Sequence, residues 1–283
     1  LKKISFFLGS LLLFFFSITL YIYYMKFYYI NLDRCEDRNR DMKRFFDTKL
    51  KTKNYKRIAG LDGKKIFDSK LEDTFFEFPD SGINKGKSVG AYGCTYSHLK
   101  ALQAFVTDKS NQEDIAIICE DDIDIFDNIE PSIIYQYLNK LPKNWEIFKI
   151  QQTSPFIGRP PPAPAIFRWK EGYWGTCAYI IKRSAAQRFV DTFFINNRFI
   201  IPPKTGIIAD RFLYNNTTTY GCFPGMFYQK NVKSTIHEKN SKEDVYSKKW
   251  YTKGVKMQKK IWENYFIKLR HNSIRSRFKF LSS

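Results

Sequence analysis

The amino-acid sequence predicts an α/β fold built on a largely parallel sheet, and three observations support this. Its 283 residues are enough to bury a sizeable core in one large domain. Short apolar runs that suit strands alternate with segments whose apolar residues recur at helical spacing. One run, Ile115–Cys119, is apolar throughout and too short for a helix, which is typical of a strand buried on both faces of a parallel sheet.

Acidic residues crowd the carboxyl end of this predicted strand, at Glu120, Asp121, Asp122 and Asp124. In open α/β sheets, ligands bind beyond the carboxyl ends of the strands. Carboxylates this close repel one another unless a cation lies among them. An oxygen-rich site of this kind suits Mg²⁺ or Mn²⁺ shared with substrate phosphates. A solvated acidic turn after a core strand is the alternative that these residues alone leave open.

The other predicted elements follow in order along the chain. Strands are expected at Phe27–Leu32, Tyr55–Ala59, Trp145–Ile150, within Gly172–Ile181, and at Gly221–Gln229. Helices are expected at Asp37–Leu50, Ser88–Phe105, Pro131–Leu141 and Ser184–Phe194. An irregular excursion occupies Lys64–Lys87. We expect these elements to form one domain at residues 27–238.

The first residues have the composition of a membrane-spanning helix. Ile4–Met25 contains no charged residue and is long enough to cross a bilayer, and lysines lie on both sides of it. We interpret residues 1–26 as an uncleaved single-pass anchor, because no small-residue cleavage site follows as it would after a signal peptide. The excess of Lys and Arg after this segment favours the cytoplasmic face for the domain.

Positive charge is concentrated at the other end of the chain. The net charge is +19, and Lys248–Lys279 carries eleven Lys or Arg against the single acid Glu263. Met257, Ile261, Tyr265 and Leu269 recur every four residues, so we predict a basic amphipathic tail at residues 239–283. Beside a membrane anchor, such a helix favours anionic head groups over nucleic acid, because its aromatic residues lie on the helical stripe.

The cysteines suggest neither a disulfide framework nor a zinc site. There are five of them, at positions 35, 94, 119, 177 and 222, and no two form a CxxC pair. We interpret most of them as small core residues.

Six short pieces of sequence, taken in their order and spacing, point to one enzyme family. They are Tyr29–Arg34 with Asp37-Arg38, Arg57–Gly63, Gly90–His98, Glu120–Asp122, Gly175–Ile181 with Ala185-Ala186, and the late Asp210. Together they resemble glycosyltransferase family 25, the lipopolysaccharide and collagen galactosyltransferase-like family, over roughly Phe27–Ile236. The resemblance implies a GT-A-like, Rossmann-type mixed sheet flanked by helices. It also implies transfer of a sugar, usually galactose, from a UDP-sugar with inversion at the anomeric carbon.

The resemblance assigns metal binding to the acidic strand end. Glu120 and Asp122 match the DxD-type element of such folds. Asp122 is expected to contact the metal, and Glu120 or Asp121 to bind metal or ribose. Asp124 is an alternative to Glu120, because Asp122-Ile123-Asp124 is itself an acid-x-acid pair. A divalent ion there, Mn²⁺ or Mg²⁺, would bridge the phosphate oxygens and offset the charge that develops on a diphosphate leaving group.

Donor-binding residues are expected at the ends of other elements. By the resemblance they are Asn31 and Asp33 for the nucleoside, Arg34 and Arg38 for phosphate, and Ser97 and His98 near the acidic strand. Charge pairing at a helix start is the alternative for the first four. A packed, hydrogen-bonded core histidine is the alternative for His98.

Inverting transfer needs a base that deprotonates the acceptor hydroxyl as it attacks. Asp210 is the candidate, since it follows a glycine-containing loop and opens a short helical segment; an N-capping aspartate is the alternative. His237 occupies the place where some related folds supply a third metal ligand, although the family pattern is not clearly kept there.

The leading hypothesis is a membrane-anchored, metal-dependent glycosyltransferase that acts on a glycan, a lipid-linked sugar or a protein hydroxyl. A sugar nucleotidyltransferase is a second hypothesis. It would normally carry a glycine-rich phosphate loop after the first strand, and Asn31–Arg40 contains no glycine. A catalytically inactive membrane-surface binding protein of the same fold is the third.

Overall fold

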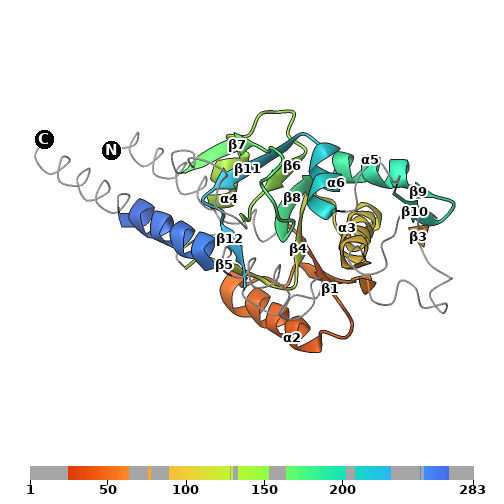
Figure 1. The fold of residues 1–283 in the computed structure, drawn as a ribbon, viewed down its shortest axis with the longest axis horizontal. Helices are drawn as coiled ribbons and strands as arrows, with labels where there is room; N and C mark the ends of the chain where they lie inside the picture. The colour runs from red at the N-terminus through yellow and green to blue at the C-terminus, as the bar shows by residue number, and fades with distance from the viewer. Residues whose placement is uncertain are drawn as a thin grey trace, which may run out of the picture.

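The computed structural model describes residues 25–63, 76–77, 89–127, 129, 133–152, 164–201, 208–230, 249 and 252–267. Its centre is a seven-stranded sheet with the order β2-β1-β4-β8-β6-β11-β7 (Figure 1). The strands are β1 (Phe27–Asn31), β2 (Tyr55–Ala59), β4 (Ile115–Glu120), β6 (Ile147–Lys149), β7 (Ala165–Arg168), β8 (Ala178–Lys182) and β11 (Thr219–Phe223).

The sheet is mixed, as predicted. β1 pairs in parallel with both β2 and β4, and β6 pairs in parallel with β11. β8 runs antiparallel between β4 and β6, and β7 is an antiparallel edge strand. Because β4 and β6 are both antiparallel to β8, five strands share one direction and their carboxyl ends meet at one edge of the sheet.

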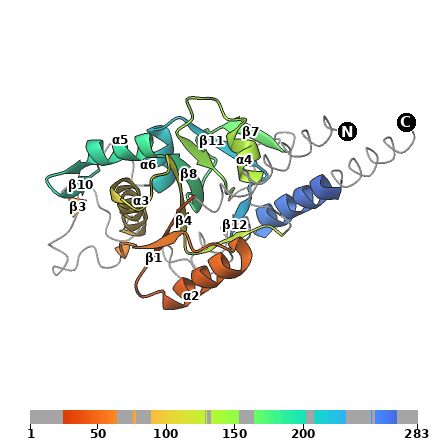
Figure 2. The same ribbon diagram turned by 180° about the vertical axis from the view of Figure 1, so that it is seen from behind.

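Helices cover both faces of the sheet. α3 (Val89–Thr107), α5 (Arg183–Phe193) and α6 (Ala209–Asn215) pack on one face (Figure 2). On the other face lie α2 (Glu36–Phe45), which continues into a π-helical turn at Phe46–Leu50, and the short α4 (Ile133–Leu138). The prediction of an α/β sheet flanked by helices is therefore confirmed.

Alternating side chains on the central strands explain the two-sided core. In β4, Ile117 and Cys119 pack in the α2-side cluster, whereas Ala116 and Ile118 pack in the α3-side cluster. All four side chains are fully buried. Successive side chains of a strand point to opposite faces, so a strand with helices on both sides must be apolar throughout. Each large aliphatic side chain buried in this way contributes roughly 1.5–3 kcal/mol.

Two small sheets complete the structure. β5 (Ile123–Ile125) follows the acidic turn and pairs antiparallel with β12 (Phe227–Gln229). β3 (Phe76–Glu77), β9 (Phe194–Ile195) and β10 (Arg198–Ile200) form the other sheet. β3 is the only described part of the predicted excursion at Lys64–Lys87.

The predicted membrane localisation is contradicted. In the described part of the chain, no helix combines the length and apolar composition needed to span a bilayer, and even the longest, α3, carries His98 and Lys100 in its middle. The predicted span lies outside the described residues except for Met25. Met25 is fully buried in the core, and Lys26 forms an ion pair with Asp108 at 2.9 Å. The last two residues of the predicted anchor therefore pack against the domain.

Part of the predicted basic tail forms a helix, at residues 252–267, that packs onto the domain. Trp262 is 1% exposed, and its Nε1 donates a hydrogen bond to the Gly225 carbonyl at 2.8 Å. The Gly225 N–H donates to Gln258 Oε1 at 2.7 Å. The buried face thus runs through Gln258 and Trp262, one residue along from the stripe predicted to begin at Met257.

Candidate active site

The acidic turn lies at the carboxyl edge of the central sheet, beside the end of β1. Glu120 is the last residue of β4, and Asp121 and Asp122 form the turn that leads into β5. β1 and β4 are adjacent parallel strands with Ile30 paired to Glu120, so Asn31 lies next to the acids. Glu120 is partly accessible, whereas Asp121 and Asp122 are each 7% exposed.

Asp121 is held by side chains from the first strand and helix. Asn31 Nδ2 donates to one of its carboxylate oxygens at 2.7 Å, and Arg38 Nη1 donates to the other at 2.9 Å. Arg57 Nε donates to Asn31 Oδ1 at 2.8 Å and so determines which way that amide points. Hydrogen bonds of this charge-assisted kind are the strong ones. Both oxygens of Asp121 are therefore committed to protein donors.

Asp122 differs from Asp121 in having one free oxygen. Its Oδ2 accepts a hydrogen bond from Gln229 Nε2 of β12 at 2.8 Å. Its Oδ1 is buried and has no hydrogen-bond partner among the described residues. Burial, reinforced by the negative charges of Glu120 and Asp121, raises the pKa of Asp122 to about 7. A buried acceptor without a donor is costly, and a cation bound at Oδ1 would relieve both the missing contact and the repulsion.

Glu120 lies between a histidine and a hydroxyl. Thr176 Oγ1 donates to Glu120 Oε1 at 3.0 Å, and His98 Nε2 lies 3.5 Å from the same oxygen. Burial raises the pKa of Glu120, but His98 and Thr176 together outweigh it and leave the pKa below its usual value. Glu120 is therefore the group that ionises first, and Asp122 the one that keeps its proton longer.

Asp210 and Glu120 accept hydrogen bonds from consecutive residues, Gly175 and Thr176. Asp210 Oδ2 accepts a hydrogen bond from the Gly175 N–H at 2.8 Å, and Gly175 immediately precedes Thr176, which binds Glu120. Asp210 is 6% exposed and is the second residue of α6, whose N-cap position is Ile208. The N-capping alternative therefore does not describe its position.

The sequence comparison identifies the family. The family model described as "Glycosyltransferase family 25 (LPS biosynthesis protein)" matches residues 25–201. The chain belongs to glycosyltransferase family 25. The resemblance is confirmed, and so is the expectation of an enzyme, because the family's members are glycosyltransferases. The match includes Asn31, His98 and the acidic turn, and it ends before Asp210.

Solved structures were compared as well, and one of those that match is a glycosyltransferase. A crystal structure of a glycosyltransferase involved in the glycosylation of the major capsid of PBCV-1 is 8% identical, with 80% of this chain and 98% of that chain covered and a TM-score of 0.31. No curated protein sequence matches the chain.

A buried lysine of this family 25 glycosyltransferase supports the turn that joins Asp210 to Glu120. Lys149 is fully buried at the end of β6, and its Nζ donates to the carbonyls of Tyr173, at 2.8 Å, and Trp174. Burial lowers the pKa of Lys149 to about 8, with Asp210 acting in the opposite direction. The lysine thus holds the two residues that precede Gly175.

Three predicted site residues of the glycosyltransferase are paired with other charges. Asp33 Oδ1 accepts from Arg57 at 2.6 Å, with the Asp33 side chain 77% exposed, and Arg34 pairs with Asp62. Asp124 accepts from Lys49 Nζ at 2.6 and 2.7 Å. The structure therefore keeps Asp124 apart from the groups of potential metal ligands described below. His237 lies outside the described residues.

Ser97 joins α3 to the loop after β2. Its hydroxyl donates a hydrogen bond to the Gly93 carbonyl at 2.6 Å and accepts one from the Leu61 N–H at 2.8 Å. The hydroxyl is thus already both a donor and an acceptor within the protein. Gly93 permits this approach, because a Cβ there would lie 2.7 Å from Leu61 O and 2.8 Å from Gly63 N. These contacts give Ser97 and Gly93 a packing role beside the site.

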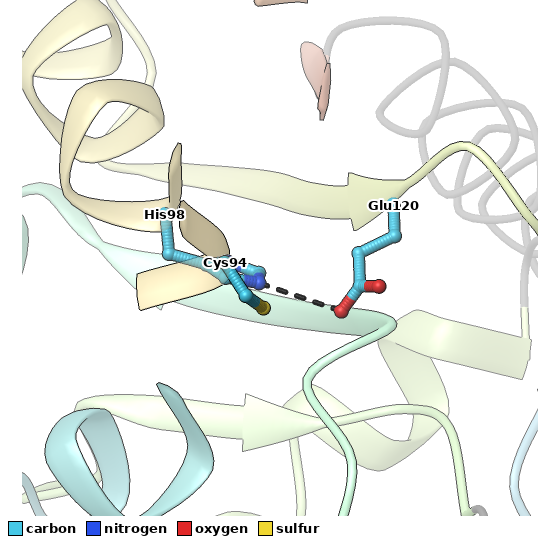
Figure 3. A group of neighbouring side chains, drawn as sticks. All are labelled: Cys94, His98 and Glu120. Atoms are coloured by element: carbon cyan, nitrogen blue, oxygen red, sulfur yellow. Dashed lines mark ion pairs between the residues drawn. The ribbon is translucent and has the colours of Figure 1, made fainter. Parts of the chain in front are cut away.

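Two cysteines belong to the site, although the sequence suggested that most cysteines were core residues. Cys177 joins Glu120 and Asp122 in one group of potential metal ligands, and Cys94 joins His98 and Glu120 in another (Figure 3). Within each group the ligand atoms lie within 4.8 Å of one another. Both cysteines were missed as site residues, although they occur in pieces of sequence that carried the family resemblance, Gly90–His98 and Gly175–Ile181, and that position was the signal that could have pointed to them.

Proposed function

We propose that this family 25 glycosyltransferase moves a sugar, galactose in the first instance, from a UDP-sugar to a glycan, lipid-linked or protein hydroxyl. We further propose that the reaction uses a divalent cation, Mn²⁺ or Mg²⁺, held by Asp122 and Glu120. The observation that carries the proposal is the buried, unpartnered Oδ1 of Asp122 at the carboxyl edge of the sheet. Carboxylate oxygens are the ligands that these hard cations prefer.

The residues present fit such a cation. Asp122 Oδ1 has no competing donor among the described residues, and Glu120 is partly accessible and ionises readily. When bound, the ion would supply positive charge for the oxygens of the diphosphate leaving group. Asp121 would keep its present role, since Asn31 and Arg38 occupy both its oxygens. We therefore propose that Asp121 orients Asn31 and Arg38 at the end of β1, where the nucleoside is expected.

We assign the base to Asp210. Inversion requires the acceptor hydroxyl to attack from the side opposite the leaving group, and a carboxylate must take its proton. Asp210 accepts a hydrogen bond from the Gly175 N–H, and the next residue, Thr176, donates one to Glu120. Lys149 donates hydrogen bonds to the carbonyls of Tyr173 and Trp174, the two residues before Gly175, and so holds this N–H in place.

The test is a screen of UDP- and GDP-sugars for donor hydrolysis and transfer, with and without Mn²⁺. The wild-type protein should hydrolyse a UDP-sugar only with the cation, and Asp122→Asn should lower the rate by at least about 100-fold because a metal ligand is lost. Asp127→Asn is the matched control, since Asp127 lies five residues along the chain, is exposed and pairs only with Lys259 among the described residues. Hydrolysis of no donor in the presence of Mn²⁺, or equal rates for Asp122→Asn and Asp127→Asn, would contradict the proposal.

A further inference from the structure

We propose that Cys94, His98 and Glu120 form a second cation site, adjacent to the carboxylate site, that takes a borderline-soft divalent ion of the Zn²⁺ class. The proposal goes beyond the sugar transfer proposed above. It concerns a ligand set that shares Glu120 with the carboxylate site and adds the sulfur of Cys94 and the nitrogen of His98.

The three side chains converge from two elements. Cys94 and His98 are four residues apart on α3, so they lie on the same face of that helix. Glu120 faces them from the end of β4, and the side chains point toward one another in Figure 3. The sulfur, a ring nitrogen and a carboxylate oxygen lie within 4.8 Å of one another, and His98 Nε2 is 3.5 Å from Glu120 Oε1.

The histidine directs its Nε2 at this group, 3.5 Å from Glu120 Oε1. His98 is fully buried, and its Nε2 has no hydrogen-bond partner among the described residues. Its other nitrogen, Nδ1, lies 3.1 Å from the Tyr179 hydroxyl. With an ion at Nε2, Nδ1 would carry the ring proton and donate it to the Tyr179 oxygen, as the second nitrogen of a metal-binding histidine usually does. A buried Nε2 that forms no hydrogen bond and faces a carboxylate oxygen is suited to a cation shared with that oxygen.

The carboxylate is oriented by the same kind of outer contact. Thr176 Oγ1 donates to Glu120 Oε1 at 3.0 Å, which holds that oxygen toward His98. Cys94 is only partly buried, so an ion can reach the group from solvent. The ring nitrogen, the thiol and the carboxylate are thus preoriented, and one of them remains accessible.

The ligand types select the ion. Cysteine sulfur and histidine nitrogen suit Zn²⁺, whereas Mg²⁺ and Mn²⁺ prefer oxygen. Ligand atoms about 2.0–2.3 Å from a tetrahedral Zn²⁺ are separated from one another by about 3.3–3.8 Å. The His98–Glu120 separation of 3.5 Å already fits, and the other two separations, both within 4.8 Å, need to shorten by no more than about 1.5 Å. Three protein ligands leave a fourth position for water.

The site can be tested by cobalt spectroscopy, which does not depend on turnover. The full chain, reduced, without an affinity tag and stripped of metal by a chelator, is titrated with Co²⁺. We expect a thiolate-to-cobalt charge-transfer band in the near ultraviolet and the visible bands of four-coordinate cobalt, and Zn²⁺ should abolish both. Cys94→Ser should remove the charge-transfer band, and His98→Gln should weaken Co²⁺ binding at least about tenfold.

The controls separate this site from its neighbour. Cys222→Ser is the matched control, because Cys222 is buried elsewhere in the core and its sulfur approaches the Lys149 carbonyl at 3.6 Å. It should keep the band, and circular dichroism should show that every variant is folded. No charge-transfer band in the wild type would overturn the proposal. A band that survives Cys94→Ser and is lost in Cys177→Ser would also overturn it, by assigning the thiolate to the Glu120–Asp122–Cys177 group. Either failure would leave the Asp122 test of sugar transfer unaffected.

Discussion

The affinity of the acidic edge for a divalent cation should fall below neutral pH, because Asp122 must lose a proton to bind an ion. The pKa of Asp122 is raised to about 7 by burial and by its neighbours Glu120 and Asp121, whereas that of Glu120 is lowered. Of the two proposed ligands, Glu120 is therefore ionised throughout and Asp122 is the one that changes charge in this range. One competing proton at a pKa near 7 weakens Mn²⁺ binding about 30-fold between about pH 8 and about pH 5.5, or about 2 kcal/mol.

The assay is calorimetric titration of Mn²⁺ into the chelator-treated protein at several pH values. Repeating it in buffers with different ionisation enthalpies counts the protons released, which should approach one per ion at about pH 6. Asp122→Asn should bind more weakly and lose this pH dependence. An affinity that is constant across the range, or a pH dependence that persists in Asp122→Asn, would refute the assignment of Asp122 as a ligand.

Three further predictions concern stability and catalysis. Without metal, Asp122→Asn should be more stable than the wild type at about pH 8, by as much as about 4 kcal/mol in urea unfolding. The reason is that the pKa of Asp122 in the folded protein, about 7, lies above the ordinary value of 3.8. The stability contributed by the protonated carboxyl is therefore lost as the pH rises through 7. Asp210→Asn retains an oxygen for the Gly175 N–H, so transfer should fall about 10²–10⁴-fold while donor binding is unchanged. Trp262→Ala should lower the free energy of unfolding by about 3–5 kcal/mol, because the indole is buried and bonded to Gly225.

Each of these predictions has its own control. Asp127→Asn should leave the free energy of unfolding at pH 8 unchanged, because its carboxylate is exposed. Weaker donor binding in Asp210→Asn would show that the residue positions the donor and is not the base. A Trp262→Ala protein as stable as Lys259→Ala, whose side chain is half exposed, would contradict the packing of the helix at 252–267 onto the domain.

The sequence predicted best those elements whose side chains are buried on both faces. The edge strand β2 was also expected at its observed bounds, Tyr55–Ala59, although only Ile58 of it is buried. The strand expected at Ile115–Cys119 is β4 but for its last residue, and it is buried from Ala116 to Cys119. A strand buried on both faces can be recognised from its own residues, because every position must be apolar. The run at Gly221–Gln229, by contrast, contains two strands in different sheets, β11 and β12, separated around Pro224. Composition alone does not show where a strand leaves one sheet for another.

Contacts between distant residues were predictable only where topology implies them. Parallel neighbours end at the same edge of a sheet, so the ends of β1 and β4 lie together and Asn31 binds Asp121. The ion pair between Lys49 and Asp124 depends on how the chain after Asp122 turns toward α2, and no local pattern records it. For the same reason the role of Lys149 was missed, because a lysine within an apolar run gives no indication of which distant carbonyls it will bond.

The central claim, that Asp122 and Glu120 hold a cation which binds the diphosphate, is tested most directly by calorimetric titration of UDP with Mn²⁺ and with a chelator. The claim predicts UDP binding that requires Mn²⁺, that is lost in Asp122→Asn and that is retained in Asp127→Asn. Equal UDP affinity with and without Mn²⁺, or binding by Asp122→Asn that matches the wild type, would contradict it.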